Sequence, residues 1–475
     1  MRILTAILVI GALAQVLCED SNTYKAAVVE YFPKKIDGNL NEVVEGRTNE
    51  YIEILSKIGE KLDIIVYPES TLLTGVVVSQ SKLIEEAAIV EVEDVPCANE
   101  KNHQKYFVNL SCAAKNHKTY LSVNLLEKVK CEGEKCPHGW WMYNTNVVFD
   151  RTGKIVASYR KLNLFGENVE VPKPMRTTFT TDFGVTFGMF ICFDIMFKEP
   201  ALEVVNQGVK HFLYPTMWFS ELPFLSAVQT QYMWSYENDV VLLASGANNP
   251  KKGSGGSGIY QGRKGPLTTY MSDKEGTKVL IADVEKVWKY SEDNEIVETS
   301  KEVEDVDGLL LIYDKLEYYN TYNLDVQQRE YRFKISEDFE CNFKVEARNT
   351  EVEVSKKSYH YKLVAYSGER SFSGVATGNV QACSILTCTD ESLKNCGHRI
   401  LKNEDTYPIK FDRIEIEMKV KENENSKQFP NAIYSNLKPL GSRNVDWKEN
   451  GRSKVISLKT PGEPFITFGI FGRVF

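Results

Sequence analysis

The first half of the chain alternates short apolar runs with helical periodicity, a pattern that predicts strands connected by helices. Residues 24–32 form one apolar run and residues 63–69 form another, which ends at Pro68-Glu69. Between them, apolar residues recur at helical spacing at Tyr51, Leu55, Ile58 and Leu62. The same reasoning predicts strands at 119–126, 146–149, 155–158, 188–197, 211–215 and 240–245, and helices at 200–209 and 225–237. This half is therefore expected to adopt an α/β fold.

The pattern changes near residue 300, beyond which polar and apolar residues alternate. Residues 412–420 show the alternation best, and 351–354 and 454–458 repeat it. A period of two predicts antiparallel strands with one face in water. An acidic stretch near 295–305 separates the two patterns. We therefore predict a first domain over 19–300 and a smaller β-rich domain over 301–475.

The first 18 residues have the layout of a secretory signal peptide, with one positive charge, an apolar run to Leu17 and then polar residues. That run is too short to span a bilayer comfortably. The chain stops at Phe475 without the polar spacer and hydrophobic tail of a lipid anchor. We expect cleavage after Cys18 and a secreted, extracellular protein without a membrane anchor.

Secretion would place the cysteines in a compartment where disulfides form. Of the 10 cysteines, cleavage removes Cys18 and leaves an odd number in an oxidising compartment, so one thiol is expected to be unpaired. Cys192 lies in an apolar run with no second cysteine nearby and is the best candidate. The others are expected to form disulfides, with the pairing left open: Cys97, Cys112, Cys131, Cys136, Cys341, Cys383, Cys388 and Cys396. Asn109 begins the only glycosylation sequon and is the predicted glycan site.

Charge and motifs exclude several functions. With 57 Lys+Arg against 65 Asp+Glu the net charge is −8, which argues against nucleic acid as the main partner. The glycine-rich stretch 253–258 matches a dinucleotide motif but no helix follows it, so we predict a flexible loop. The serine-hydrolase motif G-x-S-x-G and the zinc motif H-E-x-x-H are both absent.

Three reactive residues stand at or near the ends of predicted strands, where α/β folds place their active sites: Glu69, Lys161 and Cys192. Taken singly, each has an ordinary interpretation as a capping or surface glutamate, a surface lysine and an inert buried thiol. Together they offer a base, a cation and a nucleophile.

This combination resembles the carbon–nitrogen hydrolase (nitrilase) superfamily, whose Glu-Lys-Cys triad occurs in this chain order. Motifs along the chain are similar to those of the vanin/biotinidase branch: YPES at 67–70, NTNVVFD at 144–150, KLNLF at 161–165, CFDI at 192–195, FLYPTMW at 212–218, GSGIY at 256–260 and FGR at 471–473. The resemblance implies an α/β fold, a four-layer αββα sandwich followed by a smaller β-rich C-terminal domain.

The resemblance also implies a mechanism. Cys192 would attack an amide carbonyl to form a thioester, and Glu69 would carry the proton. Lys161 and the backbone N–H of Phe193 would stabilise the oxyanion, and a cation beside the thiol would favour the thiolate. Glu167 would be a supporting glutamate, although its spacing from Lys161 is one residue shorter than in vanins. No metal or cofactor is needed.

The substrate implied is a small-molecule secondary amide of the pantetheine or biocytin type. Trp218 and Phe219 are expected to line the acyl pocket, whereas Trp140 and Trp141 are equally consistent with core packing. Two alternatives to a vanin-like pantetheine hydrolase remain, a biotinidase-like amidase and a catalytically silent secreted binding protein on the same fold. The sequence indicates no oligomeric state.

Overall fold

The computed structural model describes residues 21–134, 136–288, 305–353, 355–441, 443–459 and 464–475. The predicted signal peptide lies outside the described residues, as does nearly all of the predicted boundary near 295–305.

Two sheets of six strands each, counted over the described residues, form the centre of the first half of the chain. The first has the order β13 (Lys278–Glu285), β1 (Thr23–Glu30), β2 (Ile64–Val66), β3 (Tyr120–Lys130), β4 (Trp140–Phe149) and β5 (Ile155–Arg160). The second has the order β12 (Pro266–Tyr270), β11 (Ser257–Gln261), β10 (Val241–Gly246), β8 (His211–Thr216), β7 (Thr186–Met189) and β6 (Thr178–Thr180). Both centres are parallel, through β1-β2-β3 and β7-β8-β10.

Alternating side chains of β1 show how the layers pack. Ala27 and Val29 belong to the core formed with α1 (Leu40–Lys57) and α3 (Lys105–His117). Ala26 and Val28 point the other way, into the core shared with the second sheet. Helix α2 (Gln80–Glu86) packs beside α1. Helices α1, α2 and α3 thus form the first layer of the predicted αββα sandwich and the first sheet forms the second. The second sheet packs on the other face of the first and forms the third layer.

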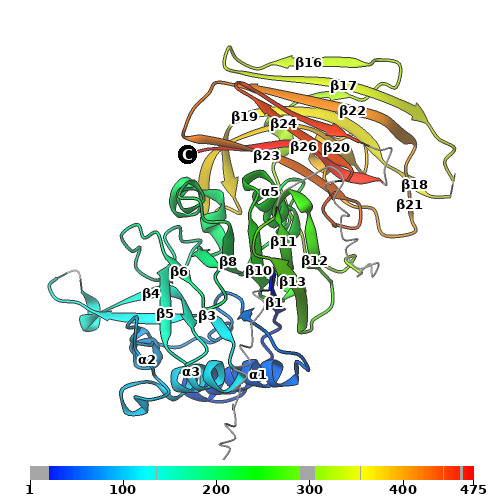
Figure 1. The fold of residues 1–475 in the computed structure, drawn as a ribbon. Helices are drawn as coiled ribbons and strands as arrows, with labels where there is room; N and C mark the ends of the chain where they lie inside the picture. The colour runs from blue at the N-terminus through cyan, green and yellow to red at the C-terminus, as the bar shows by residue number, and fades with distance from the viewer. Residues whose placement is uncertain (1–20, 135, 289–304, 354, 442, 460–463) are drawn as a thin grey trace, which may run out of the picture.

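Helix α5 (Ala227–Asn238) forms the fourth layer, and it is covered on both sides. It contacts β11 of the second sheet and β23 (Ser426–Tyr434) of the C-terminal part. Its residues 227–237 are all buried. Its polar residues are therefore not gathered on one face, as they would be in a helix with one side in water. Figure 1 shows α5 between the green strands and the yellow-to-red C-terminal strands.

The C-terminal part is an antiparallel β-sandwich. Among the described residues, one sheet has the order β15 (Asn320–Asn323), β19 (His360–Phe372), β20 (Ala376–Cys388), β26 (Phe465–Val474) and β23. The other has the order β16 (Glu330–Lys334), β17 (Phe339–Asn349), β22 (Ile409–Val420), β25 (Ser453–Leu458) and β24 (Val445–Asn450). Two short parallel pairs lie outside these sheets. β14 (Ile312–Tyr313) pairs with β9 (Glu221–Leu222) of the first half of the chain, and β18 (Lys357–Ser358) pairs with β21 (Asp405–Thr406). The predicted fold class is confirmed in both parts.

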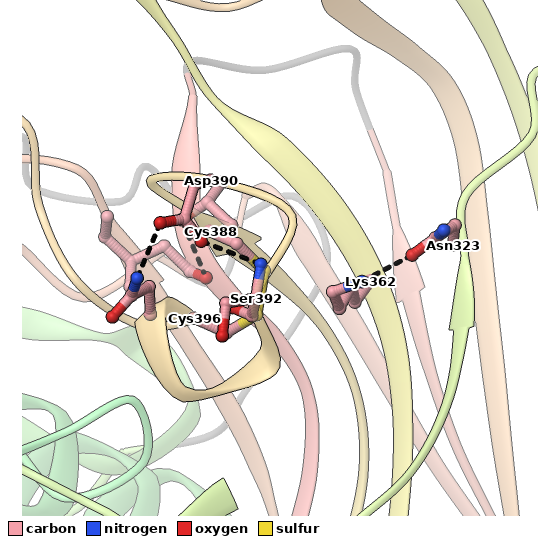
Figure 2. The surroundings of a disulfide bond; sticks show 9 residues. Asn323, Lys362, Cys388, Asp390, Ser392 and Cys396 are labelled. Atoms are coloured by element: carbon pink, nitrogen blue, oxygen red, sulfur yellow. Dashed lines mark hydrogen bonds between the residues drawn. A yellow bond between two sulfur atoms is a disulfide. The ribbon is translucent and has the colours of Figure 1, made fainter. Parts of the chain in front are cut away.

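Four disulfides occur in the described part of the chain, and the prediction of eight bridged cysteines is confirmed. The pairs are Cys97–Cys112, Cys131–Cys136, Cys341–Cys383 and Cys388–Cys396. Figure 2 shows the last of them closing a small loop, in which Asp390 accepts the backbone N–H of Ser392. Cys192 is the free cysteine, and it is buried.

Several predicted elements differ from the structure. The helix predicted to reach Leu62 ends at Lys57, and Leu62 is buried in the connection to β2. The predicted helix at 200–209 is a π-helical turn (Lys198–Leu202) followed by α4 (Glu203–Asn206). Residues 351–353 are not a strand, because β17 has already ended at Asn349. Periodicity indicates the type of these elements better than their ends.

The glycine-rich stretch also differs from the predicted flexible loop. Its residues 253–258 are buried, and β11 begins inside it at Ser257. The backbone N–H of Gly256 and the hydroxyl of Ser257 donate to the buried carboxylate of Glu30 at the end of β1. A side chain at Gly246 would collide with this carboxylate and with the Gly256 carbonyl. The glycines therefore allow close packing around a buried acid.

Candidate active site

Glu69 lies three residues after the end of β2, at the carboxyl end of the parallel strands. It is 2% exposed and accepts three hydrogen bonds or ionic contacts. Asn144 Nδ2 donates to Oε1 (2.8 Å), and the backbone N–H of Met217 donates to Oε2 (2.9 Å). Lys161 Nζ also lies 2.8 Å from Oε1. Strands of both sheets therefore fix one carboxylate.

Lys161 follows β5 and is held between two carboxylates. Its ammonium contacts Glu69 and Glu167, and the lysine is 1% exposed. Burial alone would lower the pKa of Lys161, but the charges of Glu69, Cys192 and Glu167 outweigh burial and raise it. Lys161 is therefore a permanent cation in a site shielded from water.

Glu167 contacts this cation despite its shorter spacing. Burial acts to raise the pKa of Glu167, but Lys161 and nearby backbone N–H groups, including that of Phe165, lower it. Asn144 Nδ2 lies 3.3 Å from Glu167 Oε1, so one amide touches both glutamates. The shorter segment between Lys161 and Glu167 still returns the carboxylate to the ammonium.

Cys192 does not lie on a strand, as its apolar surroundings predicted, but on a sharp turn after β7. It begins a short 3-10 helix (Cys192–Met196) and has a φ of 46°, in the left-handed region that non-glycine residues rarely adopt. The apolar sequence is explained by burial of the whole turn, since Cys192 to Met196 are all buried. Apolar residues alone cannot distinguish a buried strand from a buried turn.

Asp194 clamps this turn to the strand that carries Lys161. Its Oδ2 accepts the backbone N–H of Ile191 (3.0 Å) and the Tyr159 hydroxyl (2.8 Å). Its Oδ1 accepts the backbone N–H and the side-chain amide of Asn163, both at 2.8 Å. Tyr214 donates to the Cys192 carbonyl (2.9 Å) and holds the turn from β8. The strained nucleophile turn is thus fixed by four donors to one carboxylate and by one tyrosine.

The surroundings of Cys192 favour the protonated thiol, whereas the neighbouring cation was expected to favour the thiolate. Burial raises the pKa of Cys192 and the Glu69 charge raises it further, whereas Lys161 lowers it by less. The expectation counted the cation alone; the structure adds burial and a carboxylate. The Glu69 carboxylate is thus close enough for its charge to act on the Cys192 thiol.

A pocket opens next to Cys192. Its walls enclose about 340 Å³, part of it open solvent, and half of the residues that line it are aromatic. They are formed by Phe165, Cys192, Phe193, Met217, Trp218, Phe219, Glu221, Leu225, Phe372 and Ser373. The three residues predicted to bind substrate, Phe193, Trp218 and Phe219, are all among them. Trp140 and Trp141 are not, and begin β4 as half-buried residues.

Sequence reasoning missed three residues of this site. Asn144 and Asp194 lie within two of the motifs that resemble the family. A polar residue inside or next to a predicted buried strand could have marked each of them as part of the site. Phe372 comes from β19, about 180 residues after Cys192 in the chain, and no local pattern indicates its place in the pocket.

Other predicted features lie away from the pocket. Asn109 is half-buried on α3. Within the described ranges, no helix is long and apolar enough to cross a membrane. In the same part of the chain, no three His, Cys, Asp or Glu side chains are grouped as they would be to hold a metal ion.

Comparison with known proteins agrees with this arrangement. The family model described as "Carbon-nitrogen hydrolase" matches residues 25–251, and the one described as "Vanin C-terminal domain" matches residues 310–475. "Vanin-like protein 1" of Drosophila melanogaster is 35% identical over 98% of this chain and 88% of its own. "Pantetheinase" of Homo sapiens is 30% identical over 96% of this chain and 90% of its own. The crystal structure of Saccharomyces cerevisiae Nit3 covers 55% of this chain and 90% of its own, with 20% identity and a TM-score of 0.44.

The first of these matches defines the class of protein: a hydrolase of carbon–nitrogen bonds other than peptide bonds, in linear amides. The vanin-type C-terminal domain and the full-length relatives narrow the class further. The chain belongs to the vanin family of carbon–nitrogen hydrolases. The resemblance seen in the sequence is thereby confirmed.

Proposed function

We propose that this enzyme hydrolyses the secondary amide of pantetheine, through a Cys192 thioester. The observation that carries the proposal is the convergence of Glu69, Lys161 and Cys192 beside a pocket with aromatic walls. The pantetheinases among its relatives support the choice of substrate.

The reaction follows from the charges of the site. Glu69 takes the proton of the Cys192 thiol, and the sulfur attacks the amide carbonyl carbon. The negative charge on the carbonyl oxygen faces Lys161 and the backbone N–H of Phe193. Glu69 returns the proton to the departing amine as the carbon–nitrogen bond breaks, leaving a thioester. Glu69 then takes a proton from water, whose oxygen attacks the thioester carbonyl. As the carbon–sulfur bond breaks, Glu69 returns that proton to the sulfur, which releases the acid and restores the Cys192 thiol.

Glu167 and Asn144 have supporting roles in this scheme. The carboxylate of Glu167 is a second negative charge beside the Lys161 ammonium. It keeps the ammonium protonated when Glu69 accepts a proton and loses its own charge. Asn144 donates to Glu69 Oε1, and the backbone N–H of Met217 donates to Oε2. These two hydrogen bonds orient the carboxylate that acts as the base.

The test is a parallel assay of the purified protein on pantetheine and biocytin, with Cys192→Ala as the control. Turnover of pantetheine that disappears in Cys192→Ala is expected, together with a thioester on Cys192 in rapidly quenched samples. Activity that survives Cys192→Ala would refute the mechanism. Preferential turnover of biocytin would refute the substrate, and no turnover of either amide would favour a silent binding protein.

We also propose that the protein is secreted and glycosylated at Asn109. The signal-peptide pattern of residues 1–18 and the four disulfides of the described chain support this. Expression in cultured animal cells should yield protein in the medium that begins at Glu19. Its mass should fall on glycosidase treatment, and Asn109→Gln should lack that shift. Protein retained in the cells with Met1 still present would contradict secretion.

A further inference from the structure

Part of the active-site pocket belongs to the C-terminal domain. Phe372 and Ser373 stand at the turn between β19 and β20 and line the pocket together with residues of the hydrolase domain. The ring of Phe372 lies 5.5 Å from that of Phe193, the residue directly after the nucleophile. Phe372 is only 3% exposed, so it is packed as a wall and does not hang free in solvent.

Buried charges hold this turn against the hydrolase domain. Arg370 is 5% exposed, and its Nε lies 2.7 Å from Asp314 Oδ2, while Nη2 lies 3.2 Å from Glu221 Oε2. Glu221 lines the pocket and also accepts the backbone N–H of Ser373. The guanidinium of Arg370 lies 5.0 Å from the centre of the Phe372 ring. The turn is therefore tied to the pocket wall on both sides of Phe372.

The hydrolase segment 221–225, which contributes two residues to the pocket, is itself covered by the C-terminal domain. Thr467 donates to the Pro223 carbonyl (2.7 Å), and Asn431 donates to the Phe224 carbonyl (2.9 Å). Gly397, directly after the Cys388–Cys396 bridge of Figure 2, packs so closely that a side chain there would collide with Pro223. The C-terminal domain thus supplies the pocket wall at Phe372 and Ser373, and it also positions the neighbouring wall formed by segment 221–225.

We propose that Phe372 is a selectivity residue, through which the C-terminal domain limits the bulk of the group that reaches Cys192. The proposal uses the substrates of the proposed function, but the steric argument concerns access to the Cys192 sulfur and is independent of turnover. A rigid aromatic wall gives contact area to a slender acyl group and excludes a wider one. The bicyclic acyl group of biocytin is wider than the branched chain of pantetheine, so the wall favours pantetheine.

The experiment compares Phe372→Ala with Phe343→Ala in the full-length protein. Phe343 is a matched control, since it is a buried phenylalanine of the same domain, on β17, that does not line the pocket. Two ratios are measured: kcat/KM for biocytin against pantetheine, and the rate of Cys192 alkylation by N-benzyl iodoacetamide against iodoacetamide, read by mass spectrometry. Phe372→Ala should raise both ratios about tenfold, the size expected for one apolar contact. Phe343→Ala should leave both unchanged.

Unchanged ratios in Phe372→Ala, or equal changes in Phe343→Ala, would overturn the proposal. If Phe372→Ala fails to fold, Phe372→Leu takes its place, with a smaller rise in the same direction expected and an unchanged ratio counting against the wall. A general disturbance of the nucleophile turn would instead lower kcat for both amides and leave the ratios alone. If neither amide is turned over, the proposed function fails, while the alkylation ratio still decides the role of Phe372.

Discussion

At the scale of single residues, the candidate site is an arrangement of charges removed from water. Lys161 carries its charge between Glu69 and Glu167, and burial together with the Glu69 charge raises the pKa of the Cys192 thiol beside them. One cation and two anions leave a net charge of −1, which disfavours a resting thiolate and favours proton transfer to a carboxylate. The ammonium stabilises the buried glutamates, and in the proposed mechanism it also stabilises the developing oxyanion.

Replacing Lys161 by methionine tests this double role. Two buried carboxylates would then face each other without a cation, so we expect a loss of about 3 kcal/mol in the free energy of unfolding. Activity should fall at least about 100-fold, as for removal of one oxyanion donor. Lys154→Met is the control, because Lys154 pairs with Glu93 at the surface (2.9 Å) and its loss should alter neither quantity. Calorimetry and amide turnover give the two readouts, and a Lys161→Met enzyme with nearly full activity would contradict the assignment.

At the scale of elements, two short segments depend on one buried acid each. The nucleophile turn depends on Asp194, and the junction of β1 with the glycine-rich stretch depends on Glu30. Both acids are fully buried, and burial raises the pKa of Asp194 to about 6 and that of Glu30 to about 7, against the donors that favour the charged form. Each pKa therefore lies close to neutral pH.

Asp194→Asn should damage catalysis through the turn. An amide cannot accept on both sides, so its NH₂ group would face two donors, whichever way it is oriented. We expect a loss of about 2 kcal/mol in stability and a fall in kcat that exceeds the change in KM. Asp150→Asn is the matched control, because Asp150 caps a hairpin turn through Oδ1 alone and asparagine retains that oxygen. Equal loss of kcat in both variants would count against a specific role for Asp194.

Glu30 predicts a pH dependence of stability. The folded protein keeps the Glu30 proton up to about pH 7, whereas the unfolded chain releases it near its ordinary pKa of 4.5. Stability from this group is therefore lost as pH rises from about 4.5 to 7, by about 3 kcal/mol in total. Glu30→Gln should remove this slope, so that its melting temperature relative to the natural protein rises between pH 5 and pH 8. A constant difference across that range would show that Glu30 does not titrate there.

At the scale of the whole molecule, the sequence indicated the αββα layers, the β-rich C-terminal domain and the three candidate reactive residues. It did not indicate how the two domains contact each other. The pattern of the sequence was sufficient for β1, α5 and β22: β1 and α5 bury nearly continuous runs of residues, whereas β22 alternates buried and exposed ones. Glu69, Lys161 and Cys192, which the structure brings close together, stood out in the sequence because reactive residues at strand ends are unusual. Phe372 and Arg370 could not be found in this way, because their neighbours are distant in the chain and are chosen by tertiary packing alone.

The disulfide between Cys341 and Cys383 joins the two sheets of the C-terminal sandwich, through β17 and β20. It closes a separation of 42 residues, for which chain entropy predicts about 4 kcal/mol, whereas Cys131–Cys136 closes 5 residues, for about 2 kcal/mol. Removing the first pair with alanines should therefore lower the melting temperature more than removing the second. Activity after mild heating should follow the same order, because the C-terminal domain forms part of the pocket. Equal shifts in melting temperature would refute this ranking.

The position of β26 has a consequence for synthesis of the enzyme. This strand lies between β20 and β23 in its sheet, yet the ribosome makes it after every other described strand. Until β26 emerges, the sheet that covers α5 is divided into two parts, and the apolar residues of that helix have no complete partner. The hydrolase half is thus translated long before it can bury its own fourth layer. A chain truncated before Phe465 lacks the strand that joins β20 to β23, so α5 would be left without its complete cover.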